Sequence, residues 1–483
     1  DCPDRSTVFV MAECCPLRAQ CARELSEALA ADDVHKLLDP MFDKCCDARC
    51  EVKERIDGRN RPRGAARFGV RVNPWRAMAR DVYSWEKVYH GTKLDFLSNI
   101  VSLGYLLKCG DETPQGEVVG SRDMEKVATP DNTWRMQVKF REGRVQADAT
   151  AAFRPREFVF VSPSFAYASH RVYATPNART GTKVILEFRI KPGTYQHGPQ
   201  TVRDRVSDPA VPDDEFEYFT QRHGVMVLTG IIIQPRSPSR CSCEVWNLAV
   251  PRSPSASDAL LECPNAARRW AFLRNLGLNP LFFNHKFDRC YCGCTRLANY
   301  IQEGGRQYVL PKPGTRFALH VDEARASALD CFNFNGSWHT CFHGTQVSAV
   351  KSVLECGYLI YPGSVNVAGQ VIAAREHRDD GSRVHNATIP SDTICVSPSV
   401  RYAAHPVYAK PCVLGGRQYR LAFQFKIKAG TYRVFPSTLR EVSADQNQDF
   451  DQFVPNSEME WHTRRHGTLM LYGIVVMDEP VPP

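Results

Sequence analysis

Short runs in which apolar and polar residues alternate are spread along the chain, and each run in the first half has a counterpart in the second. Val184, Leu186 and Phe188 alternate with Ile185 and Glu187, a period of two that predicts a strand with one buried face. β-branched and aromatic residues fill the other runs as well. We therefore predict strands over 67–72, 158–161, 183–191 and 225–233, and again over 316–321, 393–397, 418–427 and 468–476.

Apolar residues at helical spacing are fewer, and they too occur in pairs. Residues 22–38 predict one helix, and residues 257–278 predict its counterpart. A further helix should follow each of two threonines able to cap it and end at a glycine: Thr92 with Gly104, and Thr345 with Gly357. Trp85 and Trp338 are expected to pack in the core. Strands outnumber helices, and irregular connections argue against parallel βαβ units, so we predict an α+β fold on antiparallel sheets.

The chain is a tandem repeat. Residues 89–92 (Tyr-His-Gly-Thr) return as 342–345 (Phe-His-Gly-Thr), and the Ser-Pro-Ser turn of 162–164 returns at 397–399. A long internal repeat fixes the domain count at two, and 483 residues give each domain enough chain to bury a core. We predict a first repeat over 1–234 (helix and cysteine knuckle 1–55, main domain 64–234), a Pro/Ser linker over 235–256, and a second repeat over 257–483 (helix and knuckle 257–300, main domain 307–479).

Composition narrows the class of protein only modestly. The net charge of +8 comes from 61 basic and 53 acidic residues that are dispersed, which indicates a solvated surface and does not favour a nucleic-acid partner. No run of 18 apolar residues occurs, so no transmembrane helix is predicted. The sequence opens at Asp1 without a basic and apolar leader, from which we expect a processed chain or a fragment.

Nineteen cysteines would suit a secreted scaffold only in a short chain, and here they stand in tight clusters beside domains of ordinary core size. Reduced thiols or metal binding in a cytosolic setting fit this pattern better than a disulfide scaffold. Three close thiols can share one tetrahedral zinc ion when a distant residue supplies a fourth ligand. The alternative is a set of free cysteines used as small hydrophobes. The candidate ligands are Cys45, Cys46 and Cys50 with Cys15 or Cys21, and Cys290, Cys292 and Cys294 with Cys263 or His285.

A histidine, a tyrosine and a glutamate recur in the same order in both repeats: His90, Tyr173 and Glu217, then His343, Tyr408 and Glu460. This series resembles the ADP-ribosyltransferase fold of the His-Tyr-Glu type. The resemblance implies a histidine bonded to the NAD ribose, tyrosines around the nicotinamide ring, and a glutamate that orients a ribose hydroxyl. A fixed carboxylate would stabilise the oxocarbenium-like sugar formed when nicotinamide leaves. We therefore expect two tandem domains with this split antiparallel β-sandwich fold, with NAD and structural zinc as the candidate cofactors.

The same resemblance implies a wider cofactor-binding set. It comprises His90, Gly91, Thr92, Phe160, Tyr167 and Tyr173 in the first repeat, and His343, Gly344, Thr345 and Tyr408 in the second. The family's first tyrosine is replaced by Phe160 and by Cys395, and Tyr167 or Tyr402 is the nearest substitute. The alternative is structural: the histidines pair with Glu217 and Glu460 inside the fold, and the glycines serve the turn.

The order of the motifs over nearly the whole chain also resembles the carboxy-terminal region of large neuralized-like proteins. That resemblance rests on 279–282 (Asn-Pro-Leu-Phe), 287–292, Trp338, the second His-Gly-Thr and Glu460-Trp461. It implies an intracellular scaffold with protein partners at centrioles or cilia, although no neuralized-type β-sandwich repeat is evident. Two hypotheses follow: a non-catalytic or weakly catalytic scaffold, or an active NAD-dependent ADP-ribosyltransferase or NAD glycohydrolase with the first repeat as the catalyst.

Overall fold

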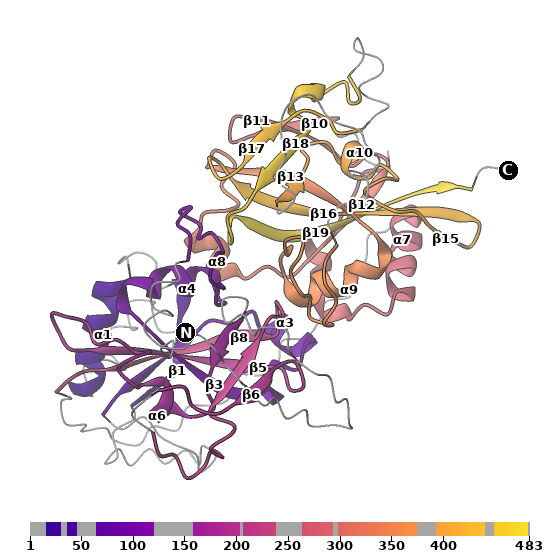
Figure 1. Cartoon of the computed structure of the whole chain (residues 1–483). Helices are drawn as coiled ribbons and strands as arrows, with labels where there is room; N and C mark the ends of the chain where they lie inside the picture. Colours follow the sequence, from indigo (N-terminus) through magenta and orange to yellow (C-terminus); the bar gives the residue numbers. More distant parts are fainter. Residues whose placement is uncertain are drawn as a thin grey trace, which may run out of the picture.

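The two halves of the chain form two α+β lobes built mainly on antiparallel sheets, which confirms the predicted fold class (Figure 1). The computed structural model describes residues 16–29, 36–45, 64–119, 158–202, 206–237, 263–292, 298–373, 393–439 and 449–481. The linker predicted at 235–256 lies mostly outside these ranges, so the domain boundaries stay a prediction.

The first lobe contains a five-stranded sheet in the order β1-β2-β8-β5-β3 and a three-stranded sheet in the order β4-β7-β6. A β-bridge between Tyr89 and Ser162 joins the two sheets. The strands are β1 (Leu38–Cys45), β2 (Ala66–Val70), β3 (Glu86–Thr92), β4 (Val159–Val161), β5 (Lys183–Ile190), β6 (Gln196–Gly198), β7 (Glu217–Thr220) and β8 (Met226–Gln234). The helices are α1 (Pro16–Ala28), α3 (Pro74–Ala79), α4 (Leu97–Leu103) and α6 (Phe165–Ala168), with 3₁₀ turns η3 (Val82–Ser84) and η4 (Leu94–Phe96).

The second lobe repeats this topology. Its larger sheet runs β13-β16-β19-β12-β9, its smaller sheet runs β14-β18-β17, and a bridge between Phe342 and Ser397 joins them. The strands are β9 (Arg289–Cys290), β12 (Gly314–Ala318), β13 (Trp338–Thr345), β14 (Ile394–Val396), β16 (Arg417–Lys428), β17 (Arg433–Phe435), β18 (Glu460–Thr463) and β19 (Leu469–Pro480). The helices are α7 (Pro264–Asn275), α8 (Glu323–Ala328), α9 (Val347–Cys356) and α10 (Val400–Ala403).

Three strands and three 3₁₀ turns complete the second lobe. The hairpin of β10 (Tyr300–Glu303) and β11 (Arg306–Val309) forms its own two-stranded sheet, and β15 (Cys412–Leu414) pairs with β16. The 3₁₀ turns are η6 (Pro280–Phe282), η7 (His285–Phe287) and η9 (Asn456–Glu458). Neither hairpin strand nor β15 has a described counterpart in the first lobe.

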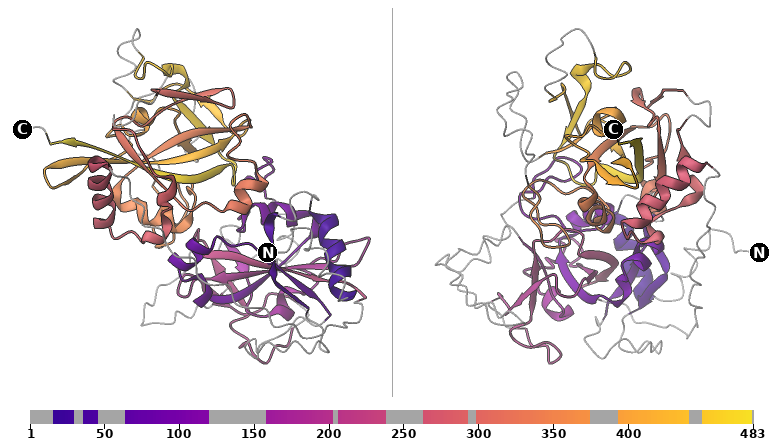
Figure 2. Two further views of the ribbon diagram at one scale, coloured as in Figure 1. Left: turned by 180° about the vertical axis from the view of Figure 1, so that it is seen from behind. Right: turned by 90° about the vertical axis from the view of Figure 1, so that its right-hand side faces the viewer.

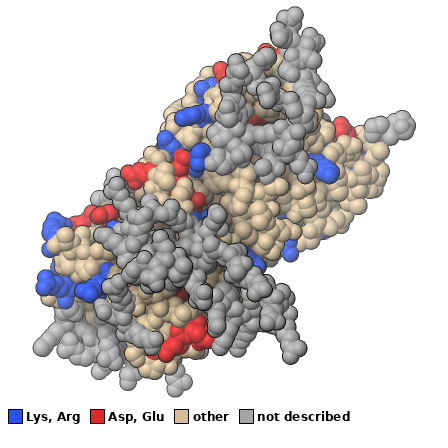
Figure 3. All heavy atoms as spheres, in the orientation of Figure 1, with Lys and Arg blue, Asp and Glu red and all other residues tan. Residues whose placement is uncertain are grey.

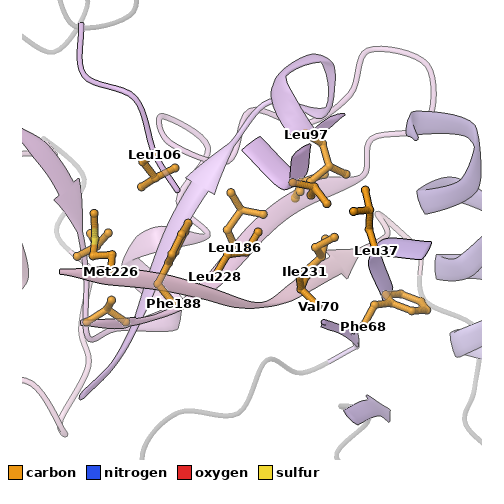
Figure 4. Close-up of a cluster of buried hydrophobic side chains, with 14 of the residues drawn as sticks. Leu37, Phe68, Val70, Leu97, Leu106, Leu186, Phe188, Met226, Leu228 and Ile231 are labelled. Carbon is orange, nitrogen blue, oxygen red and sulfur yellow. The ribbon is translucent and has the colours of Figure 1, made fainter. Parts of the chain in front are cut away.

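Each large sheet is covered on both faces. In the first lobe, α1 and α4 pack on one face around Leu186, Phe188 and Ile231, as Figure 4 shows for this core. On the other face, Phe165 and Ala168 of α6 pack against Tyr89 and Ile185. The prediction that β5 buries one face only is therefore wrong. Ile185 is buried under α6, and Glu187 is buried because Arg67 neutralises it within the sheet.

The helices after the two threonines were predicted correctly at their ends and wrongly at their starts. Gly104 and Gly357 close α4 and α9 in the left-handed conformation, as expected. Thr92 and Thr345 do not cap these helices, because each threonine is still part of a strand and pairs across the sheet. The helices begin later, and α4 is preceded by the 3₁₀ turn η4. Trp85 and Trp338 are buried, as predicted.

The first cysteine knuckle is only partly described, and its described part is a strand. Residues 38–45 form β1, which pairs with β2, so the backbone of Cys45 belongs to a sheet. The helix predicted over 22–38 is α1, which begins and ends earlier. Cys21 lies on its buried face, and its thiol donates to the Ile233 carbonyl at 3.4 Å. Cys21 is therefore a small core residue.

The two lobes meet through equivalent parts, with α3 and α4 of one lobe facing α8 and α9 of the other, and they stay side by side in all views (Figures 1 and 2). The Tyr105 and Tyr358 rings, which occupy the same place in the two repeats, stack with centroids 4.5 Å apart. The His223 and His466 rings lie parallel at 6.3 Å. Equal surfaces facing each other in this way make the contact pseudo-two-fold.

Backbone bonds across the contact obey the same symmetry. The His223 amide donates to the Val365 carbonyl at 2.9 Å, and the His466 amide donates to the Glu112 carbonyl at 3.0 Å. Arg76 of α3 lies against Gly357 and donates to the Leu354 carbonyl at 2.8 Å, and Arg325 of α8 lies against Gly104. Burial lowers the pKa of Arg76 to about 10. The contact thus excludes solvent from charged groups as well as from rings.

Charges of both signs lie on the described part of the face seen in Figure 3. Basic and acidic side chains both occur on the face of each lobe seen in Figure 3, in keeping with the dispersed charge of the sequence. None of the helices in the described ranges combines the length and the apolar character that a membrane span requires.

Candidate functional site

The histidine of each His-Gly-Thr motif is fixed at the junction of the two sheets. His90 lies on β3, and its Nδ1–H donates to the Phe160 carbonyl of β4 at 2.8 Å. His343 on β13 makes the same bond to the Cys395 carbonyl at 2.8 Å. Burial lowers the pKa of His90, so the ring is neutral at pH 7. Each histidine therefore ties the strand of its motif to the strand of the smaller sheet.

The glycine of the motif is required by close packing. A Cβ atom at Gly91 would lie 2.1 Å from the Ala168 carbonyl oxygen, and one at Gly344 would lie 1.9 Å from the Ala403 carbonyl oxygen. These carbonyls stand at the ends of α6 and α10, which pack directly on the motif strands. Only glycine leaves room for this approach. Thr92 and Thr345, the last residues of the motifs, are buried at the strand ends.

Tyr167, Tyr173 and Glu217 come together in the first repeat. Both tyrosine hydroxyls donate to the Glu217 Oε1 atom, at 2.6 and 2.8 Å, and the Thr201 hydroxyl donates to the same oxygen at 2.6 Å. Burial raises the pKa of Glu217, and the three hydroxyls oppose that rise. The pKa values of both tyrosines are raised by burial and by the carboxylate beside them. The result is a cluster in which three side-chain hydroxyls surround one oxygen of the Glu217 carboxylate.

The second repeat builds the same cluster and adds a histidine. Tyr402, Tyr408 and Thr438 donate to the Glu460 Oε1 atom at 2.7, 3.1 and 2.5 Å. The His462 Nε2–H donates to the other oxygen, Oε2, at 2.8 Å. Position 462 corresponds to Phe219 in the first repeat, a side chain that offers Glu217 no hydrogen-bond donor. The two glutamates therefore differ in the donors that the neighbouring strand position provides.

The tyrosines do not bracket an open slot. The Tyr167 and Tyr173 rings are 5.1 Å apart at an angle of 52°, and those of Tyr402 and Tyr408 are 5.2 Å apart at 44°. Their hydroxyls point at the glutamate instead. Phe160 packs on Phe158 and Phe219 across β4 and β7. His90 and Glu217 are not joined by a hydrogen bond in the described chain, so the structural alternative of a direct His–Glu pair does not hold in the first repeat.

Sequence reasoning missed the threonines and the roles of the serines. Thr201 and Thr438 follow β6 and β17 within a repeated Pro-x-Thr pattern, Pro199 to Thr201 and Pro436 to Thr438, which is the signal that could have found them. In the Ser-Pro-Ser turns, the second serine caps the next helix: Ser164 Oγ accepts from the Tyr167 amide, and Ser399 Oγ accepts from the Tyr402 amide. These caps orient the tyrosines toward the glutamates.

Three of the predicted metal ligands converge in the second repeat. The sulfur atoms of Cys263, Cys290 and Cys292 lie 3.0 to 3.4 Å from one another, near the distance of about 3.8 Å expected for thiolates on one zinc ion. Burial raises the pKa of the Cys290 thiol to about 12, so a bound cation would be needed to hold it as a thiolate. The cluster has the donors and the spacing of a metal site.

The remaining candidate ligands divide into two groups. His285 does not join the thiols, because its Nδ1 atom bonds the Asp288 carboxylate at 2.8 Å and its ring packs against Trp270. The others, Cys15, Cys46, Cys50 and Cys294, lie outside the described residues, as does the side chain of Cys45. Of the two alternatives for the distant ligand in the second repeat, the geometry therefore favours Cys263.

A second group of metal-binding side chains was not predicted. The ligand atoms of Cys395, Glu460 and His462 lie within 4.8 Å of one another, and all three residues are buried. They occupy the smaller sheet of the second repeat, beside the tyrosine cluster. No protein-family model matches the chain, so these geometries alone describe the candidate sites.

Proposed function

We propose that the chain is a non-catalytic or weakly catalytic scaffold made of two tandem ADP-ribosyltransferase-like domains. The observation that carries the proposal is that each Glu carboxylate is turned toward its own tyrosines. Glu217 and Glu460 each accept three hydroxyl hydrogen bonds on one oxygen. A carboxylate that must orient a ribose hydroxyl and face a developing cation has to give up some of these bonds first.

The fold supports the same proposal. Two lobes of one topology, joined through symmetric contacts, present the same fold twice, as a scaffold that binds partners through repeated domains would. The resemblance to the carboxy-terminal region of large neuralized-like proteins suggests protein partners in a centriolar or ciliary, microtubule-associated assembly. Such a role needs the fold of each repeat and no chemistry at its glutamate.

The experiment is a measurement of nicotinamide release from NAD by the full chain at high protein concentration. We expect release at background, equal to that of the Glu217→Gln variant, which keeps the shape of the side chain. A rate at least about tenfold above that variant would overturn the scaffold proposal.

The alternative function is NAD cleavage or ADP-ribosyl transfer by the first repeat. One observation favours it: Phe219 stands at the position of His462, so Glu217 lacks the histidine that binds the second oxygen of Glu460. In that case Glu217→Gln abolishes release, while Glu460→Gln leaves it unchanged. The pair of variants thus assigns any activity to one repeat.

We further propose that the Cys263, Cys290 and Cys292 cluster holds a structural zinc ion. The three sulfurs and the hydroxyl of Thr315, which donates to Cys290 Sγ at 3.7 Å, support this proposal. Cys292→Ser should lower the bound zinc by one equivalent. It should also weaken the packing of α7 on β12. Equal zinc in both proteins would contradict it.

A further inference from the structure

We propose that Cys395, Glu460 and His462 form a zinc-binding site that belongs to the second repeat alone. The three residues come from two paired strands. Cys395 of β14 lies directly opposite His462 of β18, and Glu460 stands two residues before His462 and therefore on the same face. Their ligand atoms lie within 4.8 Å of one another. Cys395 is 7 % exposed, Glu460 0 % and His462 3 %.

The donor set suits zinc and neutralises it. Thiolate, imidazole and carboxylate are all ordinary zinc ligands, and the described residues supply three of the four that a tetrahedral site takes. One Zn²⁺ with one thiolate and one carboxylate carries no net charge, which lowers the cost of burying the group. Binding releases one proton, that of the Cys395 thiol, while the single imidazole proton moves from Nε2 to Nδ1.

Outer hydrogen bonds already hold two of the ligands in place. The hydroxyls of Tyr402, Tyr408 and Thr438 all go to Glu460 Oε1, which leaves Oε2 directed at His462. The Thr393 hydroxyl lies 2.9 Å from His462 Nδ1, and its oxygen can accept a hydrogen bond from Nδ1–H once Nε2 binds the ion. Such supporting contacts are typical of built metal sites.

The geometry argues against a nucleophilic cysteine at the same place. A thiol activated by histidine needs one ring nitrogen facing the thiol and the other facing an acid. Here the two nitrogens of His462 face Glu460 and Thr393. Cys395 is also too buried to reach a substrate.

The first repeat supplies the matched control. Its equivalents of Cys395 and His462 are Phe160 and Phe219, which face each other across β4 and β7, while Glu217 is retained. The first repeat therefore has the glutamate and its hydroxyls but neither of the other ligands. A change at two positions converts one site into the other.

The test is a zinc titration of the reduced, metal-stripped full chain in competition with a chromophoric chelator. We expect Cys395→Ser to lower the affinity for one of the bound zinc ions by at least about a hundredfold, and Thr393→Val to lower the same affinity about tenfold. His462→Gln, which keeps an amide donor to Glu460, is the second ligand variant should Cys395→Ser fail to fold. Zinc binding of unchanged stoichiometry and affinity in these variants would overturn the proposal.

Two further arms separate this site from the thiol cluster. Cys292→Ser and Cys395→Ser should each remove one equivalent, and the double variant should remove two. If the double variant loses only the equivalent lost by Cys292→Ser, the proposed site does not exist. The Phe160→Cys/Phe219→His variant should gain one equivalent in the first repeat, and failure of this gain in a folded protein counts against the proposed ligand set.

Discussion

Arg67 and Glu187 show how a buried charge can be matched within a sheet. The Arg67 Nη2 atom lies 2.6 Å from Glu187 Oε1 and also donates to the Thr229 carbonyl at 2.8 Å. Burial alone would raise the pKa of Glu187, but the charge of Arg67 outweighs it and lowers the pKa to about 2. The pair is therefore ionised throughout the ordinary pH range.

Loss of Arg67 should be costly. We expect Arg67→Met to lower the free energy of unfolding by about 3 to 5 kcal/mol, because it leaves a buried carboxylate with the more distant charge of Lys87 and the hydroxyl of Thr229. Chemical denaturation of the two proteins at pH 7 measures the difference. Arg420→Met removes a more exposed pair with Glu479 and should cost less than about 1 kcal/mol. Equal effects of the two changes would show that burial of the pair does not matter.

For single residues, the sequence shows which side chains recur in both repeats, but it does not show which hydrogen-bond partners those side chains have. The repeat picks out His90, Tyr173 and Glu217 as a recurring set, yet the bonding of each depends on neighbours far along the chain, such as Phe160 and Thr201. His462 was missed because the repeat identifies residues that occur in both halves, and the residue equivalent to His462 in the first half is Phe219. Long-range register, which local pattern does not contain, decides which side chains meet.

At the scale of elements, the close packing of α10 on β13 makes a sharp prediction. Gly344→Ala should lower the free energy of unfolding by about 3 kcal/mol or more, because the new Cβ atom would meet a backbone oxygen that cannot rotate away. Thermal or chemical unfolding measures the loss.

The control is Gly430→Ala, at a glycine with φ of +75° and no atom near its missing Cβ. There the substitution carries only the left-handed backbone cost of about 1 to 2 kcal/mol. A Gly344→Ala protein as stable as the Gly430→Ala protein would contradict the packing argument.

Strands were predicted better than helices for a physical reason. The apolar and β-branched content of 183–191 and 418–427 reflects burial in the middle of a sheet, and β5 and β16 cover these ranges almost to the residue. The helices that follow β3 and β13 are short, and each begins only after the pairing of the preceding strand has ended. Thr92 and Thr345 resemble caps in sequence, but pairing with β5 and β16 keeps them extended.

At the scale of the whole molecule, the facing histidines make the contact between lobes sensitive to acid. Burial lowers the pKa of His466 to about 4, and that of His223 is lowered well below its usual value. Asp111 lies 3.8 Å from His466 Nε2, Lys108 is close to both rings, and His223 Nε2 is buried without a hydrogen-bond partner. A proton on either ring would find little compensation.

The unfolded chain binds a proton at a histidine near pH 6.5, and the folded chain binds it at His466 only near pH 4. The contribution of the neutral His466 ring to the free energy of unfolding is therefore fully present above pH 6.5. It is lost as the pH falls toward 4, and the loss from His466 alone is about 3 kcal/mol. Denaturation midpoints at pH 7 and pH 4 measure this loss. His466→Phe should make the dependence shallower, and His197→Phe, at a partly exposed ring outside the contact, should not. Parallel pH profiles for all three proteins would refute the assignment.

The pseudo-two-fold contact between the lobes should hold at any protein concentration. Two separate copies of such a unit would meet through the same rings and backbone bonds, and their association would weaken as the protein concentration falls. Here both partners belong to one polypeptide, so their encounter is unimolecular and its strength does not depend on how much protein is present. Because the amide bonds of His223 and His466 repeat one contact, damage to one of them leaves the equivalent bond of the other repeat in place. A scarce protein can therefore keep its two halves docked.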